Sequence, residues 1–547
     1  MRIAINELDL EFDQMFSAET VDDSDHERWY IMRIGVLRLI KLAMQAHPQF
    51  EAPTLTFQRN LAYSFQVLSL IRRAGAIEHG RRVGQILLAN SGRIERLPDH
   101  FRIILPPNLP DLELHERDLD RHHVVRDHEM FANGFEAFVG KKRKDEIKNL
   151  LAELVYPFHG HFIGYGADPM LDFYFFGHAY NEIQLAKGFD TFHFSTTFGG
   201  ITFSNYKLAA MFIMSVGMKH RAFVSALIAK EPTIRIEDIL TVSVETKNFL
   251  ESMKEFINEF GQHFEKHVPV TDDNVRTIFD VLSISRKNLT LLDRPGAPTP
   301  PLIQCSDDHV IRPLAGAIRD EVMLFLLNSL QHSFPKDYDR AQQAREGVMQ
   351  RAVERALRGA LPDLEYRGNI KLRHSGKVAT DIDLVIIEPS TARIILVQLK
   401  HQDPYGSDFA SMLARTGRLN QQVRDWLHKV RSWVGAASTS ELRASFRLPP
   451  SVTNPAVSFL VLTRHYAHSL RLVVDGTDAA FSNWTQLITA IARLQESNFP
   501  PTLERLIKEL KTLSVPDEQY YLPEPRSDWT TGRLRFTIEQ EHLETES

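Results

Sequence analysis

The sequence predicts an α/β domain with a mixed sheet in the C-terminal part of the chain, preceded by a mainly α-helical region. The first observation is three strand-like runs close together, at residues 364–372, 380–388 and 393–400, of which the last two are rich in Ile, Val and Leu. The second is a helical pattern at 419–434 that leads to a buried strand at 457–463. Neighbouring strands followed by a helix and a return strand form a mixed sheet with helices packed on both faces.

Length and composition indicate a globular protein of more than one domain. The 547 residues exceed one ordinary domain, and 43% apolar and 24% charged residues leave ample material for cores. A net charge of −6 gives no global attraction to nucleic acid, so DNA binding would need a local basic patch. The single cysteine, Cys305, excludes a disulfide framework and a multi-cysteine zinc site, and it fits a reducing cytoplasm.

The sequence predicts neither secretion nor membrane insertion. The first residues, MRIAINELDLEFDQ, lack the basic segment and the apolar run of a signal peptide. The most apolar short run, at 208–218, lies between two lysines and is too short to span a bilayer, so we expect a buried helix there. The protein is therefore expected in the cytoplasm, without a membrane partner.

Prolines mark the expected domain boundary at residues 294–301 (RPGAPTPP), which can continue neither a helix nor a central strand. Residues 1–293 then form a mainly helical region of unknown function, a candidate sensor or target-recognition part. Residues 302–500 form the α/β domain, with a core at about 341–494. Residues 501–547 add a short helix and an acidic tail that is expected to be disordered or partner-dependent.

Apolar spacing predicts the individual elements. Helices are expected before the prolines at 27–46, 57–74, 119–154, 205–229, 236–260 and 273–283, and after them at 320–332, 339–361, 419–434, 484–494 and 503–513. A further strand is expected at 470–474. Histidines in the first region (His122, His123, His128, His159, His161, His178 and His193) lack a metal-ligand spacing and are interpreted as exposed or hydrogen-bonded. The basic run at 141–144 is interpreted as a solvated helix face, with nucleic-acid contact as the alternative.

The two central strands define the candidate site. If 389–392 form the loop, Glu388 pairs with Arg393, and directly opposed residues share one face of the sheet. Counting back from that pair gives two more pairs at the open end of the hairpin: Asp383 with Gln398, and Asp381 with Lys400. Polar groups at a buried sheet's end need partners, and a metal ion is one such partner. In the preceding helix, Glu354 lies at the margin of the apolar stripe, and Glu346 lies two turns earlier on a similar side.

A helix acid followed by strand–turn–strand with a D(x)nQxK pattern and an αβ return resembles the PD-(D/E)XK nuclease superfamily. With Gln as the second acid (VQLK), it is similar to Mrr-type restriction endonucleases. The resemblance covers roughly residues 341–494 and implies a restriction-endonuclease-like fold. It implies that Asp383 binds metal, that Gln398 and Lys400 form the third-strand pair, and that Glu354 is the helix acid. Two features depart from the pattern: Ile382 stands in place of the proline, and the glutamine removes one negative ligand.

The resemblance also implies that the helix with Gln421 and Gln422 presents polar groups to DNA. Mg²⁺, or Mn²⁺ in its place, would be held by hard oxygen ligands from Asp383, the Gln398 side chain and the Leu399 backbone carbonyl. Lys400 would position the attacking water or stabilise the phosphate charge. Asp381 stays open between an extra ligand and an ion-pair partner of the lysine.

Three hypotheses follow. The first is a Mg²⁺-dependent DNA endonuclease, used in restriction or antiphage defence, whose N-terminal region recognises a target or a protein partner. RNA stays open as a substrate, and a homodimer would allow both strands of a duplex to be cut. The second is a non-catalytic module that binds nucleic acid or protein through the same fold. The third places the main activity at a histidine metal site in the N-terminal region.

Overall fold

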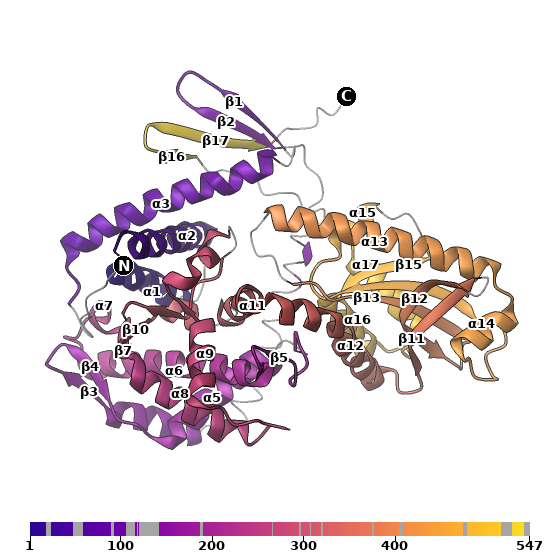
Figure 1. Cartoon of the computed structure of the whole chain (residues 1–547), viewed down its shortest axis with the longest axis horizontal. Helices are drawn as coiled ribbons and strands as arrows, with labels where there is room; N and C mark the ends of the chain where they lie inside the picture. Colours follow the sequence, from indigo (N-terminus) through magenta and orange to yellow (C-terminus); the bar gives the residue numbers. More distant parts are fainter. Residues whose placement is uncertain are drawn as a thin grey trace.

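The structure is a computed structural model of the chain. It describes all residues except 18–22, 48–57, 89–91, 106–114, 117–118, 120–139, 141, 186–189, 265, 295–296, 307, 319–320, 375–376, 404–408, 474–477, 516–527 and 541–547. The described residues combine helices with mixed sheets in two bodies, so the expected α/β class is confirmed (Figure 1). The first body has one core, built from residues between Ala4 and Ala341. The second has two cores, one on each face of a single sheet.

A buried helix, α6 (Phe203–Lys230), lies at the centre of the first body and confirms the expected buried helix at 208–218. Among the described residues it alone is long and apolar enough to cross a membrane, and 56% of its most apolar window is buried inside the protein. A helix buried on most sides is apolar on most sides, which explains its composition. The other long helices of this body are α1 (Arg2–Ser17), α2 (Asp23–Ala46), α3 (Leu61–Leu88), α5 (Pro169–Tyr180), α8 (Thr246–Gly261), α9 (Asp272–Val281) and α11 (Glu321–Ser333).

The single helix expected at 236–260 is wrong. The structure breaks it into α7 (Ile236–Ile239), a strand β7 (Val242–Glu245) and α8. The strand pairs antiparallel with β10 (His309–Arg312), where Val244 lies opposite Val310. The β-branched residues Val242 and Val244 favour a strand when a partner is present, and that partner is more than sixty residues away in the sequence.

The C-terminal tail is also different from expectation, because residues 529–540 form two strands. β16 (Trp529–Thr531) and β17 (Leu534–Gln540) join β1 (Arg93–Arg96) and β2 (Phe101–Leu105) in a four-stranded sheet ordered β1-β2-β17-β16. Phe536 stacks on Phe101 and on Trp529, with ring centroids at 5.4 and 4.8 Å. The sheet contacts α3 through β16, and Figure 1 shows the sheet beside this helix. The rest of the predicted tail lies outside the described residues.

The proline-rich segment at 294–301 is not a linker between the two bodies. Ala297, Thr299 and their proline neighbours are buried, and the Ala297 carbonyl accepts a hydrogen bond from Arg33 (3.2 Å). A Cβ added to Gly316 would lie 2.2 Å from the Pro300 carbonyl oxygen, so the next helix approaches the segment too closely for any other residue. Prolines that pack inside a body have the same sequence signature as prolines in a linker, which is why the expected boundary is wrong.

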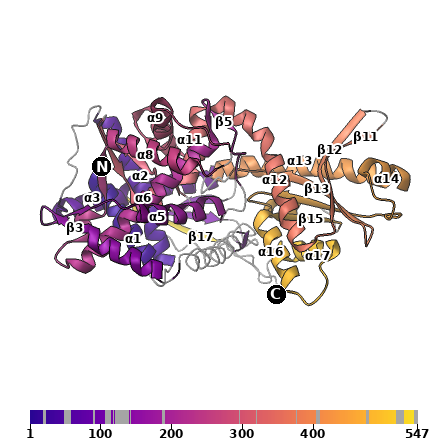
Figure 2. The same cartoon turned by 90° about the horizontal axis from the view of Figure 1, so that it is seen from below.

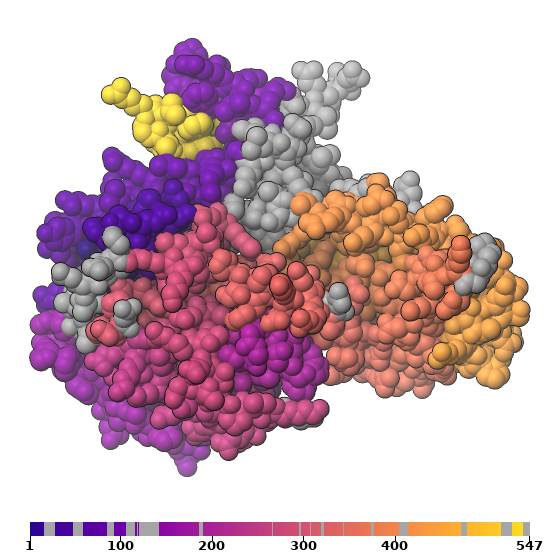
Figure 3. Space-filling view, viewed as in Figure 1, coloured from indigo at the N-terminus to yellow at the C-terminus, as the bar shows by residue number. Residues whose placement is uncertain are grey.

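The bodies are joined instead by one helix, α12 (Pro335–Ala360), which starts with a proline at its first position. Its first turns, with Tyr338 and Ala341, belong to the core of the first body. From Met349 onward its apolar residues belong to the second body. The space-filling view shows the α/β body projecting from the first body at this helix (Figure 3).

The second body is built on a five-stranded sheet ordered β11-β12-β13-β14-β15. The strands are β11 (Glu365–His374), β12 (Lys377–Glu388), β13 (Arg393–Lys400), β14 (Ala456–Thr463) and β15 (Ala479–Asn483). The first three are antiparallel neighbours, and β13, β14 and β15 run parallel. The expected three strands, helix and return strand are therefore confirmed, together with the mixed sheet.

Helices cover both faces of the sheet. The helices α12, α16 (Trp484–Glu496) and α17 (Leu503–Leu513) pack on the face that carries Leu384 and Ile386. The opposite face, with Val385 and Ile387, packs against α13 (Phe409–Ala436), α14 (Thr439–Phe446) and α15 (His468–Val473). The strand expected at 470–474 is wrong, because its described residues lie in α15. The fifth strand is the short AAFSN segment of β15, which has too few β-branched residues to predict a strand from sequence.

Candidate active site

The register of the central hairpin is confirmed at its turn, where Glu388 lies opposite Arg393. The ladder between β12 and β13 ends at Leu384 and Val397, so the two strands stop pairing just before their polar residues. At this point the Asp383 carboxylate accepts hydrogen bonds from Gln398 Nε2 and from the Leu399 backbone N–H, both at 2.6 Å. A side chain therefore continues the contact between the strands where the backbone ladder has ended.

Asp381 is not opposite Lys400, and that prediction is wrong. It lies opposite Lys371 on β11, and its backbone oxygen accepts a hydrogen bond from the Trp426 indole at 2.8 Å. The reason is the early end of the β12–β13 ladder, which leaves Asp381 paired only with the other neighbouring strand. Its side chain is exposed, and its charge still acts on Asp383.

Lys400 meets a different acid. Its Nζ lies 3.5 Å from Glu346 Oε1 on α12, while its backbone carbonyl accepts the Arg464 N–H at 2.9 Å. The position opposite Lys400 on β14 is Thr463, so the end of β13 is held in the interior of the sheet. The ammonium group is thus directed toward α12 at the same end of the sheet as Asp383.

Glu354, the acid expected from the helix, does not lie with these residues. It accepts a hydrogen bond from Gln350 (3.0 Å) and faces Arg358 at 3.8 Å. It lies eight residues beyond Glu346 on a helix that rises 1.5 Å per residue, which is about 12 Å along the axis. Because eight residues turn the helix by roughly 80° beyond two full turns, both acids lie on a similar side, and the sequence alone could not choose between them.

Burial dominates the electrostatics of Asp383. Its removal from water raises the pKa of the carboxyl to about 7, and the Leu399 N–H lowers the pKa in part. The negative charge of Glu346 raises the pKa further, Lys400 lowers it, and Asp381 adds a smaller increase. The pKa of Asp383 is therefore raised chiefly because the carboxyl is buried, while the neighbouring charges act in opposite directions.

A cavity of about 740 Å³ opens beside the site, between α12 and α13. Glu346 and Lys400 lie on its wall, so the cavity and the polar end of the hairpin are continuous. Gln422 also lines it, whereas Gln421 is bonded to Asp425 on the same helix at 2.8 Å. The other residues of the wall are Gln331, Asp339, Gln342, Arg345, His401, Gln402, Asp403, Arg415, Arg418 and Leu419.

Arg345 is a site residue that the sequence analysis missed. Its side chain is 2% exposed and its guanidinium lies over the Phe192 ring (4.1 Å) and the Tyr338 ring (4.9 Å). Its Nη1 donates to Asp403 Oδ1 at 2.5 Å, and the Tyr338 hydroxyl donates to the same oxygen. The residue falls on the buried stripe of α12, seven residues after Tyr338 and four before Met349. An arginine on an apolar stripe is the signal that could have revealed it.

The histidine metal site of the third hypothesis is not found among the described residues. His159 and His161 lie at the turn between β3 (Val155–Phe158) and β4 (Phe162–Tyr165), and His193 bonds Ser195. His178 packs against Tyr174 on α5. The described part of the chain contains no group of three or more His, Cys, Asp or Glu side chains placed to hold a metal ion. The remaining candidates, His122, His123 and His128, lie outside the described residues.

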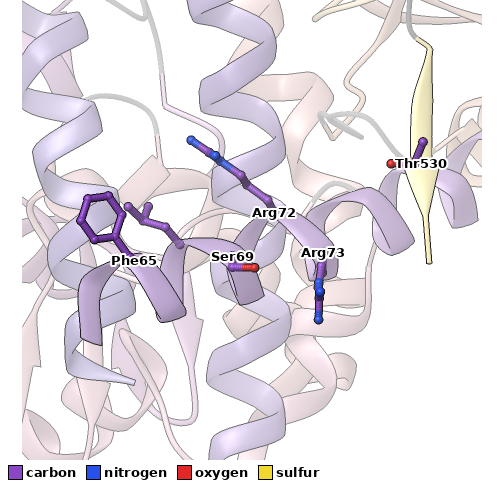
Figure 4. Close-up of a pocket in the computed structure, with 6 residues that line it drawn as sticks. Phe65, Ser69, Arg72, Arg73 and Thr530 are labelled. Atoms are coloured by element: carbon purple, nitrogen blue, oxygen red, sulfur yellow. The ribbon is translucent and has the colours of Figure 1, made fainter. Parts of the chain in front are cut away.

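A second cavity, of about 340 Å³, lies on α3 and lacks the chemistry of the first. It is lined by Phe65, Leu68, Ser69, Arg72 and Arg73 from the helix and by Thr530 from β16 (Figure 4). The two arginines point away from the helix on different sides in this view. Because no carboxylate lines it, this cavity is no candidate for a cation-dependent reaction.

Comparisons with models of protein families, with curated proteins and with solved structures find no significant match to this chain. The geometry of the described residues is therefore what bears on function. The oxygens at the end of the hairpin fit a hard divalent cation: the Asp383 carboxylate, the Gln398 Oε1 left over when its Nε2 donates, and the Leu399 carbonyl.

Proposed function

We propose that the protein is a Mg²⁺-dependent nuclease that hydrolyses phosphodiester bonds in DNA, with a restriction-endonuclease-like second body. The observation that carries the proposal is the meeting of Asp383 and Gln398 at the open end of one hairpin, with Lys400 directed toward Glu346 of α12. The order of α12, three antiparallel strands, α13 and a parallel return strand supports it. Restriction or antiphage defence is the use we propose for such an activity.

Each residue has a role in this proposal. Asp383, Gln398 and the Leu399 carbonyl would hold the cation. When bound, a divalent cation supplies a more acidic water and a counter-charge for the phosphate. Lys400 donates from Nζ to the attacking water or to a phosphate oxygen, in an environment where such a contact is stronger than in water. Glu346 directs the ammonium group of this lysine, and in this proposal it replaces Glu354 as the helix acid of the site.

The test is a cleavage assay on plasmid, linear, single-stranded DNA and RNA, with Mg²⁺, with Mn²⁺ and with EDTA. Lys400→Ala is expected to slow cleavage by at least about 100-fold, because removing one preorganised donor to developing charge costs this much in other enzymes. Lys429→Ala, which changes an exposed lysine of α13, is the matched control and should cleave normally. Equal cleavage by Lys400→Ala and wild type, or cleavage that persists in EDTA, would contradict the proposal.

A second candidate is a non-catalytic module that binds nucleic acid or protein. The observation that favours it is the hydrogen-bonded state of Asp383, whose Oδ2 is already shared by Gln398 and Leu399. A carboxylate that already accepts hydrogen bonds within the sheet can have a purely structural role. Tight binding of DNA without cleavage of any substrate in Mg²⁺ or Mn²⁺ would support this candidate over the nuclease.

A further inference from the structure

A buried ion pair connects α12 to the segment that follows β13. Arg345 Nη1 donates to Asp403 Oδ1 at 2.5 Å, and the two side chains are 2% and 14% exposed. The Tyr338 hydroxyl donates to the same carboxylate oxygen at 3.2 Å. Replacing a buried ion pair by apolar side chains often leaves a protein equally stable. Stability alone therefore does not explain why an arginine and an aspartate meet at this position.

The same turn of α12 also contacts Lys400, three residues before Asp403. Glu346 directly follows Arg345 in the sequence, and its Oε1 lies 3.5 Å from Lys400 Nζ. Consecutive residues of a helix point about 100° apart, so Arg345 and Glu346 contact two different places on the segment 400–403. The two contacts together determine how the chain that leaves β13 lies against α12.

The apolar cores leave this turn of the helix between them. Tyr338 and Ala341, on the N-terminal side, belong to the core of the first body, and along α12 the core of the second body begins at Met349. Arg345 and Glu346 lie between these positions. Their polar contacts therefore contribute to the position of this turn relative to the end of β13.

The segment after β13 is also held to other elements of the second body. The Gln402 side chain bonds both the N–H and the carbonyl of Tyr466, at 3.0 and 3.2 Å, in the loop after β14. Arg415 of α13 donates to the Asp403 carbonyl at 2.6 Å. Because the Asp403 carboxylate supplies the contact with α12, this one residue links the end of the sheet to both helices.

The first body holds the other partner of the ion pair. The Arg345 guanidinium lies over the Phe192 ring at 4.1 Å and over the Tyr338 ring at 4.9 Å, and Phe192 is 1% exposed. The start of α12 is bonded to the same body, because the Gly199 N–H donates to Asp337 at 2.9 Å. A change in the docking of the two bodies would therefore move the arginine relative to its carboxylate partner.

We infer that Arg345 is a positioning residue of the candidate site. By holding Asp403, it sets where Lys400 lies relative to Glu346, and the first body takes part because it holds the arginine. The inference rests on the proposed function for the identity of the reaction, whereas the placement of Lys400 can be measured without it. Arg345 contacts neither DNA nor a cation in this account, and it acts through the segment 400–403.

The first test measures the reactivity of Lys400 in the full chain. Lysines are acetylated with a limiting amount of the N-hydroxysuccinimide ester of acetate, and the rate at Lys400 is followed by peptide mass spectrometry. Lys400 should be acetylated about two- to five-fold faster in Arg345→Met than in wild type, the factor expected when an amine leaves a partly exposed ion pair. The exposed Lys429 is the internal reference. An unchanged rate at Lys400 in folded Arg345→Met would overturn the inference.

Further variants keep this test valid and specific. Methionine can fill the space beside the two rings, so Arg345→Met is expected to fold, which thermal unfolding checks. Asp403→Ala removes the carboxylate instead and should also speed the acetylation of Lys400, which preserves the test if Arg345 variants do not fold. Glu7→Gln is the matched control, because the Glu7 side chain is 4% exposed and accepts from Arg59 at 2.7 Å within the first body. Equal acceleration in Glu7→Gln would contradict the inference.

The second test is single-turnover cleavage at saturating DNA, with affinity measured separately by fluorescence anisotropy. Arg345→Met should lower the rate constant by roughly 10- to 100-fold at unchanged affinity, because a displacement of about 1 Å at a reacting group can cost this much. Arg345→Lys should recover part of the rate, since its ammonium group can still pair with Asp403. A merely structural role would lower the amplitude and the unfolding temperature but leave the rate constant of the folded protein unchanged, and that outcome would overturn the inference.

Phe192→Leu tests the part played by the first body. It should slow cleavage by a smaller factor, whereas Phe223→Leu, which changes a buried ring stacked on Tyr165 at 4.2 Å in the same core, should not. Equal rate constants in these two variants would contradict the role of the first body.

The two tests separate this inference from the proposed function. Cleavage that Lys400→Ala abolishes but Arg345→Met leaves unchanged supports the proposed function and overturns the inference. A wild type that cleaves nothing contradicts the proposed function, and the acetylation rates of Lys400 then decide the inference alone.

Discussion

At the scale of single residues, the two candidate helix acids give the sharpest contrast. Glu346 faces Lys400 at 3.5 Å, whereas Glu354 is bonded to Gln350 and lies about 12 Å further along α12. We predict that Glu346→Gln slows DNA cleavage by roughly ten-fold or more, because Lys400 loses its charged partner. Glu354→Gln should cleave like wild type in a single-turnover assay. A larger defect in Glu354→Gln than in Glu346→Gln would contradict this assignment.

His220 gives a prediction that is independent of the candidate site. It is fully buried, its Nε2 donates to the Ile239 and Leu240 carbonyls at 3.0 Å, and Tyr165 lies 3.2 Å from its Nδ1. Burial, together with the charge of Arg312, lowers the pKa of His220 to about 4. Because the unfolded chain binds this proton near pH 6.5, the unfolded state gains protons first as the pH falls.

The stability contributed by neutral His220 is therefore fully present above about pH 6.5 and is lost as the pH falls toward 4. A shift of this size corresponds to about 3 kcal/mol. Urea unfolding at pH 7 and pH 4.5 should show a smaller pH effect in His220→Gln than in wild type, after both are compared at matched ionic strength. The same pH dependence in both proteins would show that His220 does not titrate as stated.

At the scale of elements, the β11–β12 hairpin extends beyond the sheet and is hydrogen-bonded to α13. The Trp426 indole donates to the Asp381 carbonyl and the Trp433 indole to the Arg373 carbonyl, at 2.8 and 2.9 Å. Figure 2 shows β11 and β12 projecting past the other strands beside α13. The projecting part carries the exposed Lys371 and Lys377, two positive charges on a chain of net charge −6.

We predict that Lys371→Gln together with Lys377→Gln weakens DNA binding without changing the chemistry of bound DNA. Each lysine that no longer neutralises a phosphate should reduce the slope of log affinity against log salt by about 0.9 for duplex DNA. Fluorescence anisotropy over a salt series measures this slope, and the double variant Lys247→Gln with Lys254→Gln, on α8 of the first body, is the control. A slope that does not change in the hairpin variant would show that the hairpin does not bind phosphates.

The central hairpin was predictable because a short turn between two apolar runs fixes the pairing register. Glu388 and Arg393 are opposed as expected, and Asp383 meets Gln398. The sequence could not show where the ladder ends, so it paired Asp381 with Lys400 in error. The helix acid was ambiguous for the geometric reason that two positions eight residues apart lie on a similar side of a helix.

Contacts between segments far apart in the chain could not be predicted from the sequence. Pro298, Pro300 and Pro301 are buried, and Gly316 and Arg33 contact this segment from distant parts of the chain. Arg345 was overlooked because arginine is mostly an exposed residue, and its burial depends on Phe192 of the first body and Asp403 of the second. Features that depend on a partner far along the chain leave little local pattern.

At the scale of the whole molecule, the two bodies meet at a seam, which is the stretch of α12 that runs from the core of one body into the core of the other. Phe192 of the first body is buried under the Arg345 guanidinium and against Tyr338, with ring centroids at 5.2 Å. We predict that Phe192→Ala lowers the free energy of unfolding by about 3–5 kcal/mol, as for other buried phenylalanines. Phe173→Ala, at a position that is 52% exposed, should cost far less in the same urea titration. Similar losses of stability in both variants would contradict the proposed packing at the seam.

The central claim is that Asp383 organises a cation-dependent hydrolytic site. The most direct measurement is the rate of Mg²⁺-dependent DNA cleavage by Asp383→Asn, with DNA binding and thermal unfolding measured on the same preparation. Asn keeps an oxygen for the Gln398 and Leu399 donors, so the variant should fold and bind DNA as wild type does. We predict that its cleavage falls below detection. Cleavage at the wild-type rate by folded Asp383→Asn would contradict the claim.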